Sequence, residues 1–292
     1  MYELIQAAGS SYYMESPTKV GIVCLDGNEV AALDSGSDKD AGKKLKRLLD
    51  ANGWTLRVLF NTHSHADHIG GNRYLQEQTG CRIYAPGLDC AFTNHPLLEP
   101  SLLYGGCPPA GLRHKFLMAP ESRADELTAS VLPEGWELLE LPGHSPSMVG
   151  FRTPDDVVYL ADSLCARETL DKYGLSYLFD VEAYLDTLRR VETMQARCFV
   201  PSHAAATEDI APLARYNIEA VYAAGERIVS LCAEPTDTET LLQALFRAYG
   251  LTMTLQQYVL LGSTLRSYLT WLEKSGQVAC AIENEKLLWR RA

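Results

Sequence analysis

The segment THSHADHIGGN, residues 62–72, carries the strongest signal for fold and chemistry in this sequence. It follows the strand-like run LRVLFN and spaces three histidines and an aspartate as His63-x-His65-x-Asp67-His68. Histidine and carboxylate suit divalent first-row metals, and loops at strand ends can bring distant residues together on a rigid scaffold. Because alternate residues of an extended segment project to the same side, His63 and His65 are predicted to face one ion.

Three more ligand candidates end later strand-like segments, namely His144 in LPGHSP, Asp162 in VVYLAD and His203 in PSH. The seven candidates divide into a three-nitrogen group and a mixed group: His63, His65 and His144; Asp67, His68 and His203. Asp162 is predicted to bridge the two ions, which in two-metal sites lie about 3.5 to 4 Å apart. Burying these imidazoles and carboxylates together without a cation would be costly. The sequence therefore predicts two divalent transition metal ions, with zinc expected and iron or manganese as alternatives.

The motifs HSHADH, LPGHSP, LADS and PSH occur in the order typical of the metallo-β-lactamase superfamily, which the chain resembles over about residues 1–210. The resemblance implies an αββα fold, a binuclear site along the shared edge of two sheets, and a hydrolytic reaction. The segment ALDSG matches the family's early Asp-x-Gly motif. By this match, Asp34 is expected to brace the metal loop rather than to bind metal.

The patterns along the chain predict an α+β protein in which strands alternate with helices. Residues 1–35 indicate an antiparallel meander, and residues 39–53 a helix that ends at Gly53. Further strands and helices are predicted at these positions: strands at 56–61, 81–86, 136–142, 148–153, 156–161 and 197–203; helices at 72–80, 181–194 and 208–233. We expect residues 1–233 to form the catalytic domain, a four-layer αββα sandwich.

Two segments fall outside this alternation. Residues 88–128, here called the excursion, are rich in proline and glycine and are predicted to be ordered and to cover the pocket. Residues 237–292 predict a small C-terminal domain with three short helices, at 240–250, 254–262 and 263–276, and a hairpin at 277–291. Three helices and a hairpin suggest a winged-helix-like domain.

Composition and charge indicate which classes of binding partner this protein is expected to lack. The 26 basic and 37 acidic residues give a net charge of −11, which disfavours binding to nucleic acid. No export signal and no apolar run of about 20 residues is visible, so we expect a cytoplasmic protein that binds no membrane. The eight cysteines form no C-x-x-C pair and are expected to be free thiols.

The C-terminal domain leaves alternatives open. Residues 237–292 hold six basic and five acidic residues, too even a balance for a strong phosphate-binding face. The helix predicted at 263–276 is rich in leucine and aromatic residues, which favours packing or a homodimer through this domain over DNA recognition. A winged-helix nucleic-acid-binding regulator with a vestigial metal site is the alternative from another functional class. A phosphodiesterase or endoribonuclease of the same fold is the main enzymatic alternative.

We hypothesise that a hydroxide bridging the two metals attacks an ester, thioester, lactone or amide carbonyl of a small-molecule substrate. Asp67 is the predicted catalytic residue, because a carboxylate there can orient the hydroxide and take up its proton. Four other residues are predicted to lie outside the ligand set. His95 and His114 are expected to be solvated loop residues, with pocket lining as the alternative, and Tyr173 and Tyr177 to be packing residues, with hydrogen bonding to an oxyanion as the alternative.

Within the superfamily, the segments THSHADHIGGN and LPGHSPSMVGF look most like the glyoxalase II-like branch, which favours thioester hydrolysis. The C-terminal segment does not resemble the glutathione-binding extension of that branch, so other acyl substrates and phosphoesters stay open. A flavodiiron oxidoreductase would need glutamate where this chain has His65. A β-lactamase is also disfavoured, because its members often have cysteine where this chain has Asp162.

Overall fold

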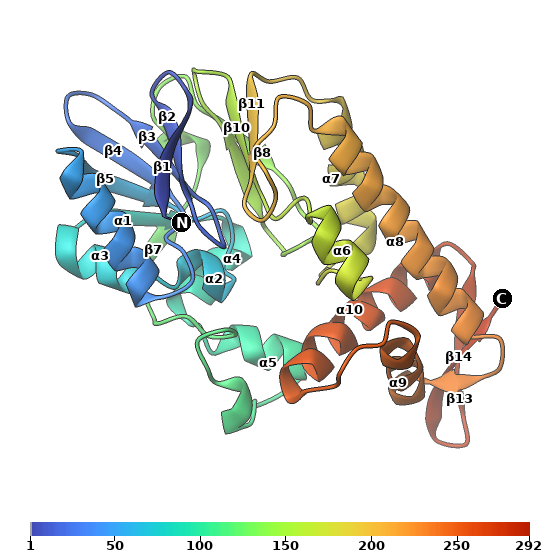
Figure 1. The fold of residues 1–292 in the computed structure, drawn as a ribbon. Coiled ribbons are helices and arrows are strands. Elements are labelled where there is room, and N and C mark those ends of the chain that lie inside the picture. Colours follow the sequence, from blue (N-terminus) through green and yellow to red (C-terminus); the bar gives the residue numbers. More distant parts are fainter. Residues whose placement is uncertain (1) are drawn as a thin grey trace.

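The computed structural model describes residues 2–292 and shows two facing sheets with helices on their outer faces (Figure 1). The first sheet follows the chain in order from β1 to β7. Strands β1 to β4 form the predicted antiparallel meander, and β4 to β7 run parallel. Its strands have these bounds: β1 (Glu3–Ala8), β2 (Ser11–Glu15), β3 (Val20–Cys24), β4 (Glu29–Leu33), β5 (Thr55–Phe60), β6 (Arg82–Ala85) and β7 (Ala124–Glu126).

Helices α1 (Lys39–Ala51) and α3 (Asn72–Thr79) cover the outer face of this sheet, with the short α2 (Ala66–Ile69) between β5 and α3. Helix α1 begins at Asp38, whose side chain accepts hydrogen bonds from the backbone N–H groups of Asp40 and Ala41. Its apolar face buries Leu45 and Leu49 against the sheet. The helical spacing of these leucines had predicted this helix correctly.

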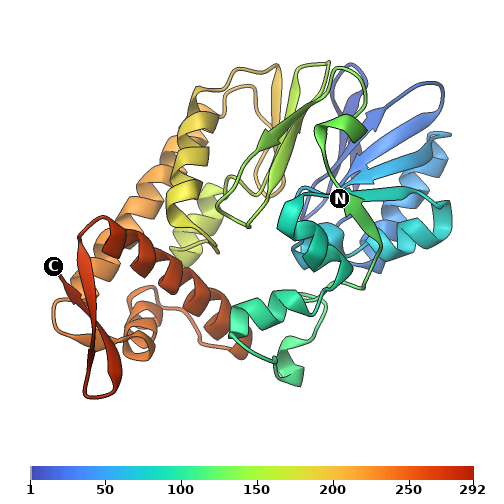
Figure 2. The same cartoon turned by 180° about the vertical axis from the view of Figure 1, so that it is seen from behind.

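The second sheet has the order β11-β10-β9-β8, in which β10 and β11 are parallel and the other pairs antiparallel. Helices α7 and α8 lie on its outer face (Figure 2). The elements of this half have these bounds: β8 (Glu137–Glu140), β9 (Val149–Arg152), β10 (Val157–Ala161), α6 (Arg167–Tyr173), α7 (Val181–Thr193), β11 (Cys198–Pro201) and α8 (Ala211–Leu231).

Three apolar clusters fill the three interfaces between the four layers. Leu45 and Leu75 belong to the cluster between the first sheet and its helices, and Phe60 and Phe151 to the cluster between the sheets. A third cluster, which includes Leu188, lies between the second sheet and α7 and α8. Each sheet buries both of its faces and each helical layer buries the face that it turns to its sheet, so the predicted αββα sandwich is confirmed.

The excursion contains helices of its own: α4 (Gly87–Asn94), α5 (Leu98–Tyr104) and η1 (Ala110–Leu112). It returns to the first sheet at β7 and is followed by η2 (Ala129–Val131). Leu103, Leu112 and Leu117 of the excursion form a buried cluster with Val259 from the C-terminal segment. The excursion is thus anchored to the far end of the chain.

The C-terminal segment comprises β12 (Thr236–Asp237), α9 (Thr238–Ala248), α10 (Leu255–Lys274), β13 (Val278–Glu283) and β14 (Lys286–Arg291). The predicted hairpin is confirmed, but the prediction of separate helices at 254–262 and 263–276 is wrong. These residues form the single helix α10, and Gly262, the predicted break, is buried within it. A glycine inside a helix costs only about 1 kcal/mol, which the packing of both halves of α10 outweighs.

The apolar residues predicted at 263–276 pack within the molecule, because Leu265, Tyr268, Leu269 and Leu272 are all buried in the cluster that contains Leu188. The winged-helix-like character of this segment and a homodimer through it stay predictions. Within residues 2–292, no helix combines the length and the apolar character needed to cross a bilayer.

Candidate metal centre

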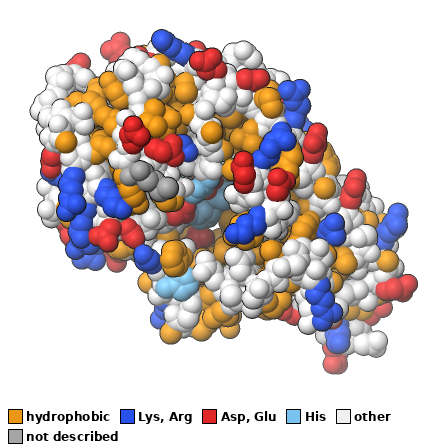
Figure 3. All heavy atoms as spheres, viewed as in Figure 1, with side chains coloured by type: hydrophobic (Ala, Val, Ile, Leu, Met, Phe, Trp, Pro, Cys, Tyr) orange, Lys and Arg blue, Asp and Glu red, His pale blue; other side chains and the backbone are white. Residues whose placement is uncertain are grey.

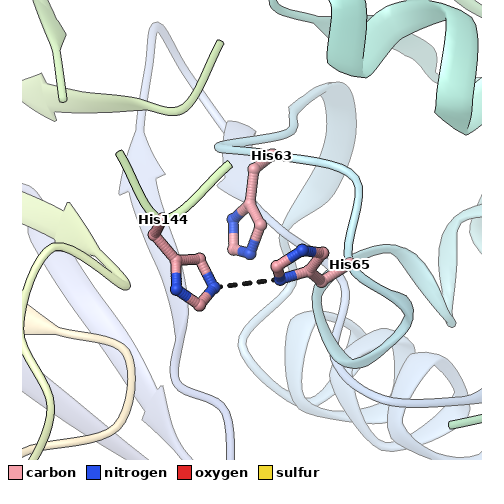
Figure 4. A group of neighbouring side chains, drawn as sticks. All are labelled: His63, His65 and His144. Carbon is pink, nitrogen blue, oxygen red and sulfur yellow. Dashed lines mark hydrogen bonds between the residues drawn. The ribbon is translucent and has the colours of Figure 1, made fainter. Parts of the chain in front are cut away.

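Three of the predicted ligands, His63, His65 and His144, converge from two loops (Figure 4). His63 lies in the loop after β5, His65 immediately precedes α2, and His144 lies in the loop after β8. His144 Nε2 lies 2.9 Å from His65 Nδ1. One ring nitrogen of each histidine lies within 4.8 Å of the others, which is the arrangement of a three-nitrogen metal site.

The second predicted group also comes together. Asp67 Oδ2 lies 3.1 Å from His203 Nε2 and 3.6 Å from His68 Nε2. Asp162 stands between the two groups, because its Oδ1 lies 3.1 Å from His68 Nε2 and its Oδ2 lies 3.4 Å from His144 Nε2. Its carboxylate therefore occupies the position expected of a bridging ligand. Figure 3 shows histidine side chains at the bottom of a hollow in the middle of this face.

Four of the five imidazoles are oriented by a hydrogen bond at the nitrogen that faces away from the centre. Three of these bonds join Nδ1 to a distant acceptor: His68 to Asp34 Oδ2 (2.8 Å), His144 to the Tyr177 carbonyl (3.1 Å) and His203 to the Pro17 carbonyl (3.0 Å). In the fourth, His63 Nδ1 lies 3.0 Å from the hydroxyl oxygen of the preceding residue, Thr62. An Nδ1–H donor leaves Nε2 as the lone-pair nitrogen, and Nε2 is the atom that these four rings turn to the centre.

Asp34 has the bracing role expected of it. Its carboxylate accepts hydrogen bonds from the Thr62 backbone N–H (2.8 Å) and the Thr62 hydroxyl (2.7 Å), as well as contacting His68. It is fully enclosed, at 1% exposure. Asp34 thus joins the start of the metal loop to a ligand six residues later.

Asp89, in the first turn of α4, is a site residue that the sequence reasoning missed. Its buried carboxylate accepts hydrogen bonds from the Ser64 N–H (2.9 Å) and hydroxyl (2.8 Å), from the Ser147 N–H (2.9 Å) and from the Ser145 hydroxyl (3.2 Å). It therefore holds the loop of His63 and His65 against the loop of His144. The sequence feature that could have pointed to such a buried acceptor is the serine next to each of these histidines.

The pKa shifts suit metal binding in the three-nitrogen group. Burial lowers the pKa of His63 well below its ordinary value and lowers those of His65 and His144 to about 4. These imidazoles are therefore neutral at neutral pH, which is the form that binds a metal ion.

The negative charge of the centre lies on Asp67, in the second group, and on Asp162, between the groups. Burial would raise the pKa of Asp162, but His203 and His68 outweigh burial and hold it well below its ordinary value. Burial would likewise raise the pKa of Asp67, and His68 and His203 lower it instead. Both carboxylates are ionised at neutral pH, so they can hold a cation.

Whether the centre suits a metal ion can be judged from its buried polar atoms that make no hydrogen bond. His63 Nε2, His68 Nε2 and Asp162 Oδ1 are buried and make no hydrogen bond to any residue in the range 2–292. Leaving such an atom unsatisfied costs about 1 to 3 kcal/mol. All three are ligand atoms for divalent metals and belong to the same cluster. The donor set therefore fits divalent metal ions.

The remaining candidates lie outside the ligand groups. His95 is exposed after α4, and the His114 ring contacts Phe116. Tyr173 is 39% exposed on α6, whereas the Tyr177 ring lies 5.3 Å from that of His65. The eight cysteines are free thiols, as predicted.

The model of the metallo-beta-lactamase superfamily matches residues 14–203, which include all seven predicted ligands. The chain belongs to this superfamily.

Curated relatives within the metallo-beta-lactamase superfamily are named hydroxyacylglutathione hydrolase, which agrees with the predicted resemblance to glyoxalase II. The relative from Methylococcus capsulatus is 28% identical over 150 residues, which are 51% of this chain and 48% of that protein. The relative from Cereibacter sphaeroides is 27% identical over 63% of this chain and 64% of that protein. The chain thus spans less than two thirds of the length of these relatives.

Solved structures of the metallo-beta-lactamase superfamily share the fold. A beta-lactamase domain protein from Burkholderia ambifaria aligns with a TM-score of 0.75 and 18% identity over 99% of this chain and 94% of that chain. A metallo-beta-lactamase family protein from Thermus thermophilus aligns with a TM-score of 0.72 and 18% identity over 97% and 99% of the respective chains. At this identity the likeness shows the fold alone.

Proposed function

We propose that this protein is a metallohydrolase that binds two divalent metal ions and cleaves an ester, thioester or lactone carbonyl in a glyoxalase II-like reaction. One observation carries the proposal: the imidazole and carboxylate atoms meet from both sheets, and three buried ones (His63 Nε2, His68 Nε2 and Asp162 Oδ1) make no hydrogen bond within residues 2–292. The proposed ligands are the two groups described above, with Asp162 between them. Zinc is the proposed metal, with iron or manganese as the alternatives that this donor set accepts.

When bound, such ions lower the pKa of a coordinated water and polarise a carbonyl oxygen. Asp67 is the proposed catalytic residue beside them. Its Oδ2 accepts a hydrogen bond from the Thr18 hydroxyl (2.9 Å) and contacts His203. Its Oδ1 makes no hydrogen bond within residues 2–292, so this oxygen is available to orient the attacking water and to hold its proton.

A cavity of about 160 Å³ beside the centre supports a small acyl substrate. His65, Asp67, Glu99 and Tyr177 supply its polar wall, and the other lining residues are apolar: Ala66, Phe116, Leu117 and Leu260. Among residues 2–292, no lysine or arginine lines it. The proposed metal ions can neutralise one phosphoryl group, but the long backbone of RNA needs further cationic partners, so the lining favours a small acyl group over RNA.

A second cavity, of about 240 Å³, lies between α6 and α10 and shares Tyr177 and Leu260 with the first. Its lining includes Leu175, Leu251 and Leu261. An apolar acyl chain entering from the metal centre would meet apolar walls in both cavities. The two cavities therefore support an acyl thioester or ester as substrate class.

The test is a screen of the metal-loaded protein against thioesters, lactones, phosphodiesters and RNA, combined with elemental analysis. His63→Ala and Asp162→Ala should lose bound metal and turnover together, whereas His95→Ala, which changes an exposed histidine, should keep both. Cleavage of RNA or phosphodiesters alone would favour the nuclease alternative. Full activity in metal-depleted protein or in either ligand variant would refute the proposal.

A further inference from the structure

His65 differs from the other four histidines of the centre in how its ring is held. It turns Nδ1, not Nε2, toward the cluster, where Nδ1 lies 2.9 Å from His144 Nε2. Its outward nitrogen, Nε2, makes no hydrogen bond within residues 2–292. The group that faces this nitrogen is the carboxyl of Glu99, whose Oε1 lies 3.6 Å away.

Glu99 is an unusual residue for this position. It is only 8% exposed, and its carboxyl makes no hydrogen bond within residues 2–292. A buried carboxyl without a partner destabilises the fold, so a role at the centre would account for it.

The position of Glu99 is set by the C-terminal segment. Glu99 lies in the first turn of α5, and α5 packs against α10 through Leu103 and Val259 (Figures 1 and 2). Helix α10 belongs in turn to the core that contains α7 and α8. The contact of α5 with α10 and the packing of α10 in the core therefore fix where the Glu99 side chain lies relative to His65.

We propose that Glu99 is the positioning residue of His65. Its carboxyl accepts a hydrogen bond from the Nε2–H of His65, and this bond holds Nδ1 of His65 toward the metal. The inference rests on the proposed metal centre and extends it to a residue outside the ligand motifs. Histidine ligands generally donate their outward N–H to such a partner. A hydrogen bond needs about 2.9 Å between N and O, so a side-chain rotation that closes less than about 1 Å makes it.

The test uses the full-length variants Glu99→Gln and Glu99→Ala, with Glu121→Gln as a control that removes an exposed carboxylate of the same excursion. Zinc affinity is measured by chelator competition, and the ligand field by the absorption spectrum of the cobalt-substituted protein. We expect Glu99→Ala to bind one ion about 10 to 100 times more weakly and to shift the cobalt spectrum. Glu99→Gln, which keeps an acceptor oxygen, should lose less, and Glu121→Gln should match the wild type.

The melting temperature of the chelator-treated protein separates positioning from a structural role. Glu99→Gln replaces a buried ionisable group by a neutral amide of the same size, so the metal-free variant should be at least as stable as the wild type while its metal affinity falls. Unchanged affinity and spectrum in Glu99→Ala would overturn the inference and leave the metal centre standing. A loss of metal-free stability in Glu99→Gln would overturn it as well. Failure of the wild type to bind two ions would overturn the proposed function and this inference together.

Discussion

Replacing Asp89 by alanine should weaken both the fold and the three-nitrogen site, although Asp89 is not among the proposed ligands. The carboxylate is at 0% exposure and joins Ser64, between His63 and His65, to the loop that follows His144. Its removal therefore releases two ligand-bearing loops at once.

The magnitude follows from the groups left without an acceptor. The backbone N–H groups of Ser64 and Ser147 cannot turn elsewhere, and each unsatisfied buried donor costs about 1 to 3 kcal/mol. The two serine hydroxyls can rotate to other acceptors. Asp89→Ala should thus lower the free energy of unfolding by about 2 to 6 kcal/mol. Asp89→Asn keeps one acceptor oxygen and should lose roughly half as much.

Urea denaturation of the chelator-treated protein measures the first effect, and calorimetric zinc titration measures the second. We expect zinc affinity at one site to fall by about 10- to 100-fold, as for other groups that orient ligands. Asp125→Asn, which changes an exposed carboxylate on β7, is the matched control and should alter neither quantity. Wild-type stability together with full zinc affinity in Asp89→Ala would refute the role given to this residue.

Three further predictions concern the acyl cavities, the C-terminal segment and the contact between the two sheets. Leu260→Ala should join the two cavities and shift kcat/KM toward longer acyl thioesters, and an unchanged chain-length profile would argue against an acyl site there. Leu269→Ala, in the shared core at 0% exposure, should cost about 2 to 5 kcal/mol in a single unfolding transition, and two separate transitions would show an independent domain. Burial would raise the pKa of Asp155, but hydrogen bonds from Ser10 and Ser11 lower it below 3.8, so this carboxylate stabilises the fold above about pH 4 and loses that effect as pH falls further. The stability difference between wild type and Asp155→Asn in urea should therefore shrink from pH 7 to pH 3, and a constant difference would contradict the assignment.

The sequence alone predicted the elements whose signals are local. Apolar spacing predicted α1 and α7, alternation predicted the meander, and the motifs at strand ends predicted the seven candidate ligands that the structure brings together. It also gave the bracing role of Asp34, through the family motif. The helices and strands could be predicted because their periods are properties of short segments, whereas the candidate ligands and Asp34 were found because each lies in a short motif of the family.

The tertiary structure alone decided which distant groups hold the centre together. Asp89 joins the two loops that carry ligands, the Pro17 and Tyr177 carbonyls accept hydrogen bonds from ligand rings, and Glu99 faces His65. No local pattern connects their segments to the ligands. The tertiary structure also decided that Gly262 continues a helix, because α10 packs along its length against the core and the excursion. Hydrogen bonds and contacts of this kind arise only when the layers have packed, so their partners are set by the fold as a whole and not by the spacing of residues along the chain.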